Sequence, residues 1–424
     1  MLLIFSDNIT ERLRYVCHFI LKEQLGLDYS ISTDLIHCSH SEHYVINYSH
    51  KNIEGEVFKI KPHALLFENN IKPQQIECAL SNNQTSFFNI KESDIEFDVF
   101  AAVFYLISRY EEYLPHSKDQ YGRYAHENSI AFKNNFLHIP IVNIWIAIFS
   151  EKIKHRFQKI ICYKPTFKTL ITYDIDIAWS YLNKGLWRSI GGMLKKPSLE
   201  RIKVLLKLKR DPFDCYDFLD ELHQSNNTEV IYFFLMADKK GAFDKNISPQ
   251  KSAFQKLIKN HAKFYQIGLH PSWKSFMREE YLNAEKSSLE KIIKSKIINS
   301  RQHYIKFDLP NTYQHLIDSG IQNDFSMGYG SINGFRASVA SSFFWYDLPK
   351  ENITNLRIFP FCFMDANCHY EQNLTILESK KELFYYRDAC KEINGLFIPI
   401  FHNNFMGSDP AFVGWRNIYR SLLA

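Results

Sequence analysis

The sequence lacks the patterns that would assign it to several common classes of protein. Its eight cysteines are scattered and include no C-x-x-C pair, which is typical of reduced thiols in the cytoplasm. No run of about 18 apolar residues occurs, so no transmembrane helix is expected. The apolar start is too short for a signal peptide and is followed at once by Asp7 and Glu11. These absences predict that the protein is cytoplasmic, either free or at the inner face of the membrane.

Basic residues are not concentrated in any one segment. The net charge is only +5 over 424 residues, and the run from Lys203 to Arg210 is short. A surface that binds nucleic acid needs clustered positive charge on one face. We therefore expect no nucleic-acid partner. No repeat or low-complexity segment is visible either, and the oligomeric state is not predicted.

The length of the chain exceeds that of one ordinary hydrophobic core and predicts two domains. Hydrophobic residues make up 46% of the chain and charged residues 23%, a balance typical of globular proteins. The chain becomes basic and irregular around residues 155–168. We therefore predict an N-terminal α/β domain of unknown role at 1–160, without catalytic residues, and a second domain at 166–424.

The N-terminal part begins with a predicted buried strand at residues 2–6. Thr10 can cap a helix, which Gly26 can end, because apolar residues recur after Thr10 at helical spacing. A second helix is predicted from Asp98, as its cap, to residue 114, before Pro115. This segment is almost entirely apolar up to Arg109, so we expect the helix to be buried.

The C-terminal part alternates between strand-like and helical segments. The predicted strands are 168–173, 229–236, 263–269, 300–307, 321–325, 356–364 and 396–401. The predicted helices are 213–224, 249–262, 279–298, 311–319 and 378–393, with Pro249 at the first position of the second. This alternation is typical of a parallel sheet with crossover helices and favours an incomplete (β/α) barrel of about seven parallel strands. An open doubly wound sheet is the alternative, although no glycine-rich phosphate loop follows its strands.

Polar side chains with catalytic potential fall at or near the ends of these predicted strands. They are Asp174, Asp176, His270, Arg301, His303, Asp365 and His402. In a parallel barrel the carboxyl ends of the strands share one mouth, where active sites form. Carboxylates and imidazoles gathered there suit a divalent metal such as zinc.

Each of these signals alone has an ordinary structural explanation. A D-x-D after a strand is commonly a turn or a cap, and a single histidine beside an apolar strand is commonly a hydrogen-bonded core residue. His303 fits that description, and Arg301 is equally suited to hold a structural carboxylate. The prediction therefore depends on all of them falling at the same kind of place in order.

In that order the motifs resemble those of the NodB-homology polysaccharide deacetylases, carbohydrate esterase family four. The matching segments are T-Y-D-I-D at 172–176 and G-L-H-P-S at 268–272, followed by Arg301 and His402. The resemblance covers residues 166–424. The stretch F-D-V-F-A-A-V-F-Y-L-I-S-R-Y-E-E-Y-L at 97–114, with D-Q-Y-G-R-Y at 119–124, looks like an uncharacterised domain that precedes such deacetylases in some bacterial proteins.

Two departures from the family pattern matter. The family's paired aspartates are usually adjacent, whereas Ile175 separates them here, although i and i+2 side chains still leave a strand on one side. The family motif has a second histidine four residues after the first, and Lys274 occupies that place. We infer that His303, on the neighbouring predicted strand, replaces the missing metal ligand.

The resemblance implies removal of an N-acyl group, typically acetyl, from a sugar of a bacterial glycan or its precursor. Asp176, His270 and His303 would hold a divalent metal, expected to be Zn²⁺. Asp174 would be the general base and His402 the general acid. Arg301 would orient Asp174, and Asp365 would do the same for His402. Arg336 and Trp273 are candidate substrate-binding residues, and Arg336 is equally suited to brace its own loop.

Two other functions remain open at the level of sequence. A D-x-D glycosyltransferase would use the aspartates to bind a metal and a nucleotide sugar, but it would leave His270 and His402 unexplained. A non-catalytic glycan-binding or scaffold protein on the same fold would explain the absent second histidine. The segment H-C-S-H-S-E-H at 37–43 looks like a metal cluster, but no second ligand pair stands near it.

Overall fold

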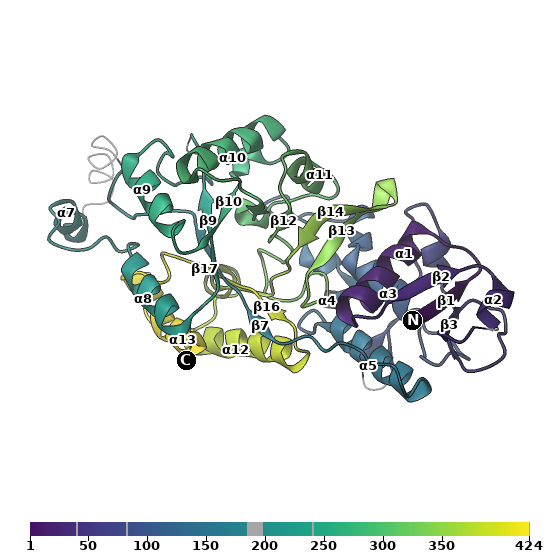
Figure 1. Ribbon diagram of the computed structural model, residues 1–424. Helices are drawn as coiled ribbons and strands as arrows, with labels where there is room; N and C mark the ends of the chain where they lie inside the picture. The colour runs from purple at the N-terminus through teal and green to yellow at the C-terminus, as the bar shows by residue number, and fades with distance from the viewer. Residues whose placement is uncertain (40, 82–83, 185–197, 240, 424) are drawn as a thin grey trace. The chain divides into compact units, whose positions relative to one another are not determined.

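The computed structural model describes residues 1–423 except 40, 82–83, 185–197 and 240, and the chain forms two compact units (Figure 1). The first unit contains Met1–Lys168, Gly334–Pro360 and Asp388–Leu396. The second contains Thr169–Asn333, Phe361–Arg387 and Phe397–Ala424. Each unit is thus assembled from three separate stretches of chain. The linear domains at 1–160 and 166–424 stay a prediction.

The first unit is built on a four-stranded parallel sheet with the order β2-β1-β3-β4. The strands are β1 (Leu2–Ser6), β2 (Tyr29–Ser32), β3 (Tyr44–Tyr48) and β4 (Val57–Lys59). The central strand β1 is buried along its whole length, as expected for an apolar run inside a parallel sheet. Its side chains Leu3 and Phe5 pack with Cys38, Val45 and Ile53 in one cluster.

The helix after β1 begins as the sequence predicts. Thr10 is the cap of α1 (Glu11–Cys17), and its side chain accepts a hydrogen bond from the Leu13 N–H. The chain continues directly into a π-helix, η1 (His18–Gln24). Gly26 follows with φ +65°, a left-handed conformation that glycine adopts without steric cost.

The second predicted helix is shorter than the sequence suggests. Asp98 caps α3 (Val99–Ile107) by accepting from the Ala101 N–H, and every residue of α3 is buried. The prediction that the helix continues to residue 114 is wrong, because Arg109 is left-handed with φ 56°. The Arg109 guanidinium instead pairs with Glu111 and Glu112 in the following 3-10 helix, η3 (Tyr110–Tyr113).

The other elements that lie within the first unit are mostly short. They are α2 (Leu35–Ser39), η2 (Ala64–Phe67), β5 (Ala79–Ser81), β6 (Gln84–Ser86), η4 (His126–Asn128), α4 (Ile130–Lys133), α5 (Ile141–Arg156), β13 (Phe343–Asp347), η7 (Leu348–Lys350) and β14 (Asn352–Ile358). Strands β13 and β14 form an antiparallel pair. The Arg12 guanidinium, buried in α1, pairs with Glu351 in the turn between them, which ties this later segment to the N-terminal one.

The second unit contains a parallel sheet with the order β12-β11-β10-β9-β8-β17-β15. The strands are β8 (Ile171–Ile175), β9 (Val230–Leu235), β10 (Gln266–His270), β11 (Asn299–Ser300), β12 (Asn323–Asp324), β15 (Phe363–Met364) and β17 (Pro399–His402). The predicted parallel α/β sheet is therefore confirmed. Its closure into a barrel stays a prediction.

Helices connect the strands of the second unit in the alternating pattern expected for crossovers. They are α7 (Leu199–Leu205), α8 (Tyr216–Asn226), α9 (Ser252–His261), η5 (Trp273–Ser275), α10 (Glu279–Ile293), η6 (His303–Ile305), α11 (Asn311–Asp318), η8 (Asn367–Glu371), η9 (Pro410–Phe412) and α13 (Trp415–Leu423). Three further elements contain residues of both units, because a unit boundary falls within each of them. They are β7 (Lys168–Thr169), α12 (Ile376–Glu392) and β16 (Leu396–Phe397). Among the described residues no helix is both long and apolar enough to cross a membrane.

Several predicted elements differ from the structure, among them the strand predicted at 396–401, which is divided into β16 and β17. The strand predicted at 300–307 ends at Ser300, because Tyr304 and Ile305 have positive φ and form η6. The strand predicted at 356–364 is two strands, the end of β14 and the short β15. Pro249 does not begin a helix, since α9 starts at Ser252 after Lys251 as its cap.

Candidate metal centre

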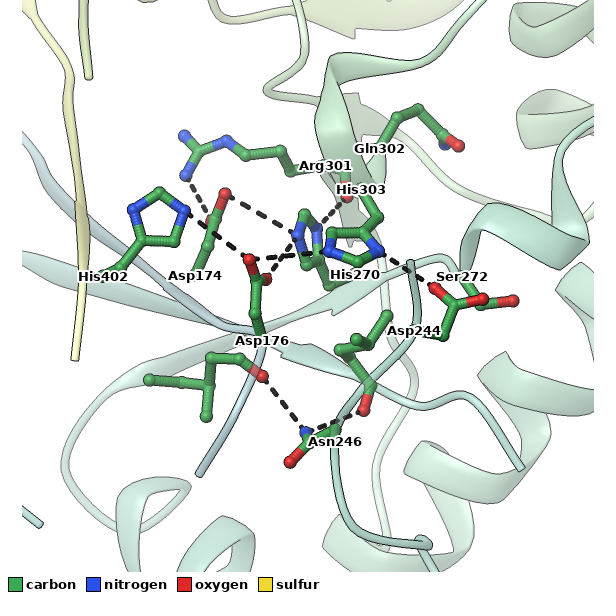
Figure 2. A network of polar contacts seen from close by, with 12 residues as sticks. Asp174, Asp176, Asp244, Asn246, His270, Ser272, Arg301, Gln302, His303 and His402 are labelled. Carbon is green, nitrogen blue, oxygen red and sulfur yellow. Dashed lines mark hydrogen bonds and ion pairs between the residues drawn. The ribbon is translucent and has the colours of Figure 1, made fainter. Parts of the chain in front are cut away.

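The two aspartates of the D-x-D motif lie at the end of the central strand β8. Asp174 belongs to the strand itself rather than following it, and Asp176 is the first residue beyond its end. Their side chains point to the same side, as alternate residues of an extended chain do (Figure 2). Asp174 is buried, whereas 29% of the Asp176 side chain is exposed. Asp176 therefore faces the opening of the site.

Two histidines from the neighbouring strand ends converge on Asp176. His270 ends β10, and its Nε2 lies 3.1 Å from Asp176 Oδ1. The Nε2 atom of His303, in η6 just after β11, lies 3.5 Å from Asp176 Oδ2. One ligand atom from each of the three residues lies within 4.8 Å of the others. The structure thus brings together the three residues that the sequence predicts as metal ligands.

Each histidine is held by a hydrogen bond on its other ring nitrogen. Nδ1 of His270 donates to the Arg301 carbonyl at 2.5 Å, and Nδ1 of His303 contacts Asp244 Oδ1 at 3.0 Å. Such partners fix the ring orientation and the tautomer of histidines that bind metals. Both Nε2 atoms are therefore presented toward Asp176 (Figure 2).

These residues fit a divalent metal on structural grounds. Asp176 Oδ1 is a buried oxygen that lies 3.1 Å from His270 Nε2 but makes no hydrogen bond of good geometry among the described residues, although buried carboxylate oxygens are normally satisfied. One carboxylate and two imidazoles form a common three-residue donor set for catalytic zinc, with further positions left open. A metal ion at this point would satisfy Asp176 Oδ1.

The charges in this cluster perturb its pKa values in a consistent direction. Burial alone would lower the pKa of His303, but the Asp176 carboxylate beside it raises that pKa to about 9. Burial also works against ionised Asp176, yet His303 and His270 hold its pKa well below the usual range. The histidine contacts thus favour the ionised form of Asp176.

His402, at the end of β17, approaches the same carboxylate from the other side. Its Nε2 lies 3.7 Å from Asp176 Oδ2, and its Nδ1 contacts Asp365 Oδ1 at 2.6 Å. The backbone N–H of His402 also donates to Asp365 Oδ2 at 2.7 Å. Burial opposes protonation of His402, but the Asp365 carboxylate raises its pKa to about 10. The raised pKa favours the imidazolium form of His402, whose Nε2 is aimed into the site.

Arg301 anchors Asp174 by a hydrogen bond. Its Nη1 donates to Asp174 Oδ1 at 2.9 Å, and its Nε donates to the Phe325 carbonyl at 3.0 Å. The guanidinium lies 4.4 Å from the ring centroid of Phe233 on β9, a cation–π contact. Arg301 is completely buried, so it positions Asp174 and is not itself exposed to a substrate.

The remaining predicted residues have other surroundings. Lys274, in the place of the family's second histidine, is exposed and lies over the Tyr281 ring at 4.5 Å. Trp273 is the first residue of η5, and its backbone N–H donates to Asp244 Oδ1. Arg336 belongs to the first unit, where it is buried and pairs with Glu112. That pairing corresponds to the bracing role rather than to an anion-binding one.

The histidine-rich segment at 37–43 does not stand out in the structure. His40 lies outside the described residues. Among the described residues, potential metal ligands converge in a group of three at Asp176, His270 and His303, and this group includes no residue of the segment 37–43.

Two residues of the site were missed at the level of sequence. Asp244 holds His303 and the Trp273 N–H, and Asn246 bonds to the Ile175 and Leu235 carbonyls at the ends of β8 and β9. The available signal was their place in the loop after β9, at the same edge of the sheet as the other candidates. No periodicity or motif marks them.

Comparison with known proteins adds little about activity. Residues 2–158 match a family described as a family of unknown function (DUF7033), and a search of curated proteins gives no match. A Mycobacterium smegmatis protein assigned as a polysaccharide deacetylase is similar in structure at a TM-score of 0.40 and 12% identity, over 62% of this chain and 87% of that one. The polysaccharide deacetylase Bc1974 from Bacillus cereus gives a TM-score of 0.30 and 10% identity, over 61% and 86%. The PuuE allantoinase gives 0.38 and 10%, over 60% and 84%. Similarity at this level does not establish a shared activity.

Proposed function

We propose that the second unit binds a divalent metal, expected to be Zn²⁺, and hydrolyses an N-acyl group, typically acetyl, on a sugar. The observation that carries this proposal is the convergence of Asp176, His270 and His303, whose ligand atoms lie within 4.8 Å of one another. When bound, the metal would lower the pKa of water and polarise the acyl carbonyl. The polysaccharide deacetylase resemblance of the motifs at 172–176 and 268–272 supports a sugar substrate.

The protein's own residues supply the proton transfers in this mechanism. Asp174 Oδ1 is occupied by Arg301, which leaves Oδ2, 3.8 Å from His270 Nε2, to face the ligand cluster. Asp174 would take the proton of the attacking water as general base.

His402 would give a proton to the leaving amine as general acid. It is suited to this role because its pKa is raised to about 10, which favours the imidazolium form. Asp365 holds the ring by Nδ1 and leaves Nε2 pointing at the side of Asp176 opposite the two histidine ligands. General acid and general base then flank one reacting amide.

The test combines metal content with product analysis. Freshly purified protein should contain about one equivalent of zinc or a similar metal by inductively coupled plasma mass spectrometry. It should release acetate from N-acetylated saccharides without any nucleotide sugar, and chelation should abolish that release. Bound metal with transfer from a nucleotide sugar would favour the glycosyltransferase. Absence of bound metal, with no zinc-dependent rise in melting temperature, would favour a non-catalytic glycan-binding protein.

A further inference from the structure

A cavity of about 610 Å³ adjoins the candidate metal centre. Asp244 lies in its wall and is the carboxylate that holds the ligand His303. The other side chains that matter are Lys239, Phe243, Trp273, Lys274, Phe276 and Arg278. The volume is in the range that accommodates a small ligand such as one or two sugar residues. The cavity is therefore linked to the metal centre through the contact between Asp244 and His303.

The aromatic wall of the cavity is rigidly packed. The ring of Phe243 stacks on Trp273 with centroids 4.0 Å apart, and the Lys306 ammonium lies 3.6 Å from the Trp273 centroid. The Phe243 ring and the Lys306 ammonium would overlap if both lay on the same face of the Trp273 indole. They must therefore cover its opposite faces. Trp273 thus offers its edge to a ligand and cannot stack on a sugar ring. Its role is to hold the Lys306 charge at the wall by a cation–π contact.

Lys239, Lys274 and Arg278 are the basic side chains among the described residues that line the cavity. Lys274 and Arg278 both lie against the ring of Tyr281, with the Lys274 ammonium at 4.5 Å and the Arg278 guanidinium at 5.8 Å from its centroid. Neither they nor Lys239 forms an ion pair with any residue that the structure describes. The carboxylate in the described wall, Asp244, is already engaged by His303 and the Trp273 N–H.

We propose that this cavity binds the anionic group of the substrate, so that the protein acts on an acidic saccharide. Like charges held together in a concave site repel each other and raise the local concentration of anions. A phosphate or a uronic-acid carboxylate linked to the N-acylated sugar would neutralise them. This inference rests on the proposed function, since it places the acyl group at Asp176 and the anion beside Lys274 and Arg278.

The test is direct binding to the full-length, metal-loaded protein by isothermal titration calorimetry. The probes are N-acetylglucosamine, N-acetylglucosamine 1-phosphate, the glucuronate–N-acetylglucosamine disaccharide and inorganic phosphate. At least one acidic saccharide should bind about tenfold or more tightly than the neutral sugar, and the preference should shrink with added salt. Binding of the sugar phosphate alone identifies a phosphate as the anion, and binding of the disaccharide alone identifies a carboxylate.

Matched variants localise the effect. The exposed pair Lys274→Ala/Arg278→Ala should lose most of the preference and retain the affinity for neutral N-acetylglucosamine. The control pair Lys259→Ala/Lys381→Ala removes two exposed charges elsewhere on the second unit and should retain the preference. Melting temperatures of both pairs should match that of the wild type.

Three results would overturn the proposal. Equal affinity for neutral and acidic saccharides would remove the anion preference. A preference that survives Lys274→Ala/Arg278→Ala would place it elsewhere, and inorganic phosphate binding as tightly as the sugar phosphate would remove saccharide recognition. Failure of the proposed function gives a different outcome, namely no bound metal and no acetate release, and the same titrations on the metal-free protein then measure the anion preference.

Discussion

At the scale of single residues, each member of the cluster is oriented by a partner of opposite character. The Arg301 carbonyl and Asp244 hold the two histidine ligands, and Arg301 and Asp365 hold the two proposed proton carriers. Buried polar groups are costly unless they are paired, so these contacts both stabilise the site and determine its geometry. Changes to single side chains therefore test individual roles.

His303→Ala should abolish metal binding while leaving the fold in place. A site with three protein ligands loses most of its affinity when one is removed, and the His303 ring contacts the carboxylates of Asp176 and Asp244. Metal analysis of the variant, with Lys274→Ala as a matched neighbour that should retain the metal, is the measurement. Full metal occupancy in His303→Ala would show that it does not replace the family's second histidine.

His402→Ala should reduce amide hydrolysis by about two to four orders of magnitude, because the leaving amine then departs without a proton. The loss should be much smaller for an activated aryl ester, whose leaving group needs no protonation. The ratio of variant to wild-type rates on the two substrates is the measurement. Equal losses would leave His402 with a binding or structural role.

Asp365→Asn should move the alkaline limit of activity to lower pH. The Asp365 carboxylate raises the pKa of His402, whose imidazolium must be present for acid catalysis and is lost as pH rises through that pKa. Removing the negative charge lowers the pKa, so the rate should begin to fall earlier as pH increases. The measurement is the pH profile of kcat for the wild type and for Asp365→Asn. If the alkaline limb is the same in both, the loss of activity at high pH belongs to a group other than His402.

At the scale of secondary-structure elements, the site depends on close packing between neighbouring strands. Gly268 on β10 lies against the Phe233 ring on β9, and a Cβ at Gly268 would meet Phe233 Cδ1 at 2.3 Å. Phe233 in turn supports the Arg301 guanidinium. The spacing of two strands thus controls the position of the residue that anchors Asp174.

Gly268→Ala should therefore affect both stability and activity. The added methyl group should displace Phe233 and lower the free energy of unfolding by about 1–3 kcal/mol. Displaced Phe233 should shift Arg301 and Asp174, which lowers kcat more than metal affinity. Denaturant unfolding and kinetics measure the two effects, and Gly320→Asn, at φ +74° with no atom within 4 Å, is a control for glycine replacement away from the site. If Gly268→Ala has the kinetics of the wild type, the spacing of β9 and β10 does not control the position of Asp174.

At the scale of the whole molecule, two compact units are each built from segments far apart in the sequence. In the first unit, Arg336 of the later segment pairs with Glu112 of the earlier one at 2.6 Å, and Arg109 also contacts Glu112. Burial opposes the charge on Glu112, but the two guanidinium groups lower its pKa to about 2. This buried pair links residues that are 224 positions apart.

Arg336→Ala should destabilise the first unit by about 3 kcal/mol, because it leaves the buried Glu112 with less positive charge around it. Metal content should not change. The control Lys350→Ala, whose side chain is 61% exposed, should cost less than about 1 kcal/mol. If Arg336→Ala has normal stability but binds substrate more weakly, Arg336 contacts the substrate.

The chain alone determined the kind of site but not how its parts are held. Strand positions, residue types and the resemblance of the motifs to those of the deacetylases together predicted Asp176, His270 and His303, since parallel strands bring their carboxyl ends to one edge. The capping residues Thr10 and Asp98 were also readable, because a helix cap depends on local hydrogen bonds.

The tertiary structure decided what depends on distant contacts. The break at Arg109 follows from its pairing with Glu111 and Glu112, and the end of β11 follows from the positive φ of Tyr304. Asp244 gains its role only because folding carries it to His303, 59 positions away. Local sequence specifies propensity and pattern, whereas a long-range pair acquires its energy only when folding has buried both partners.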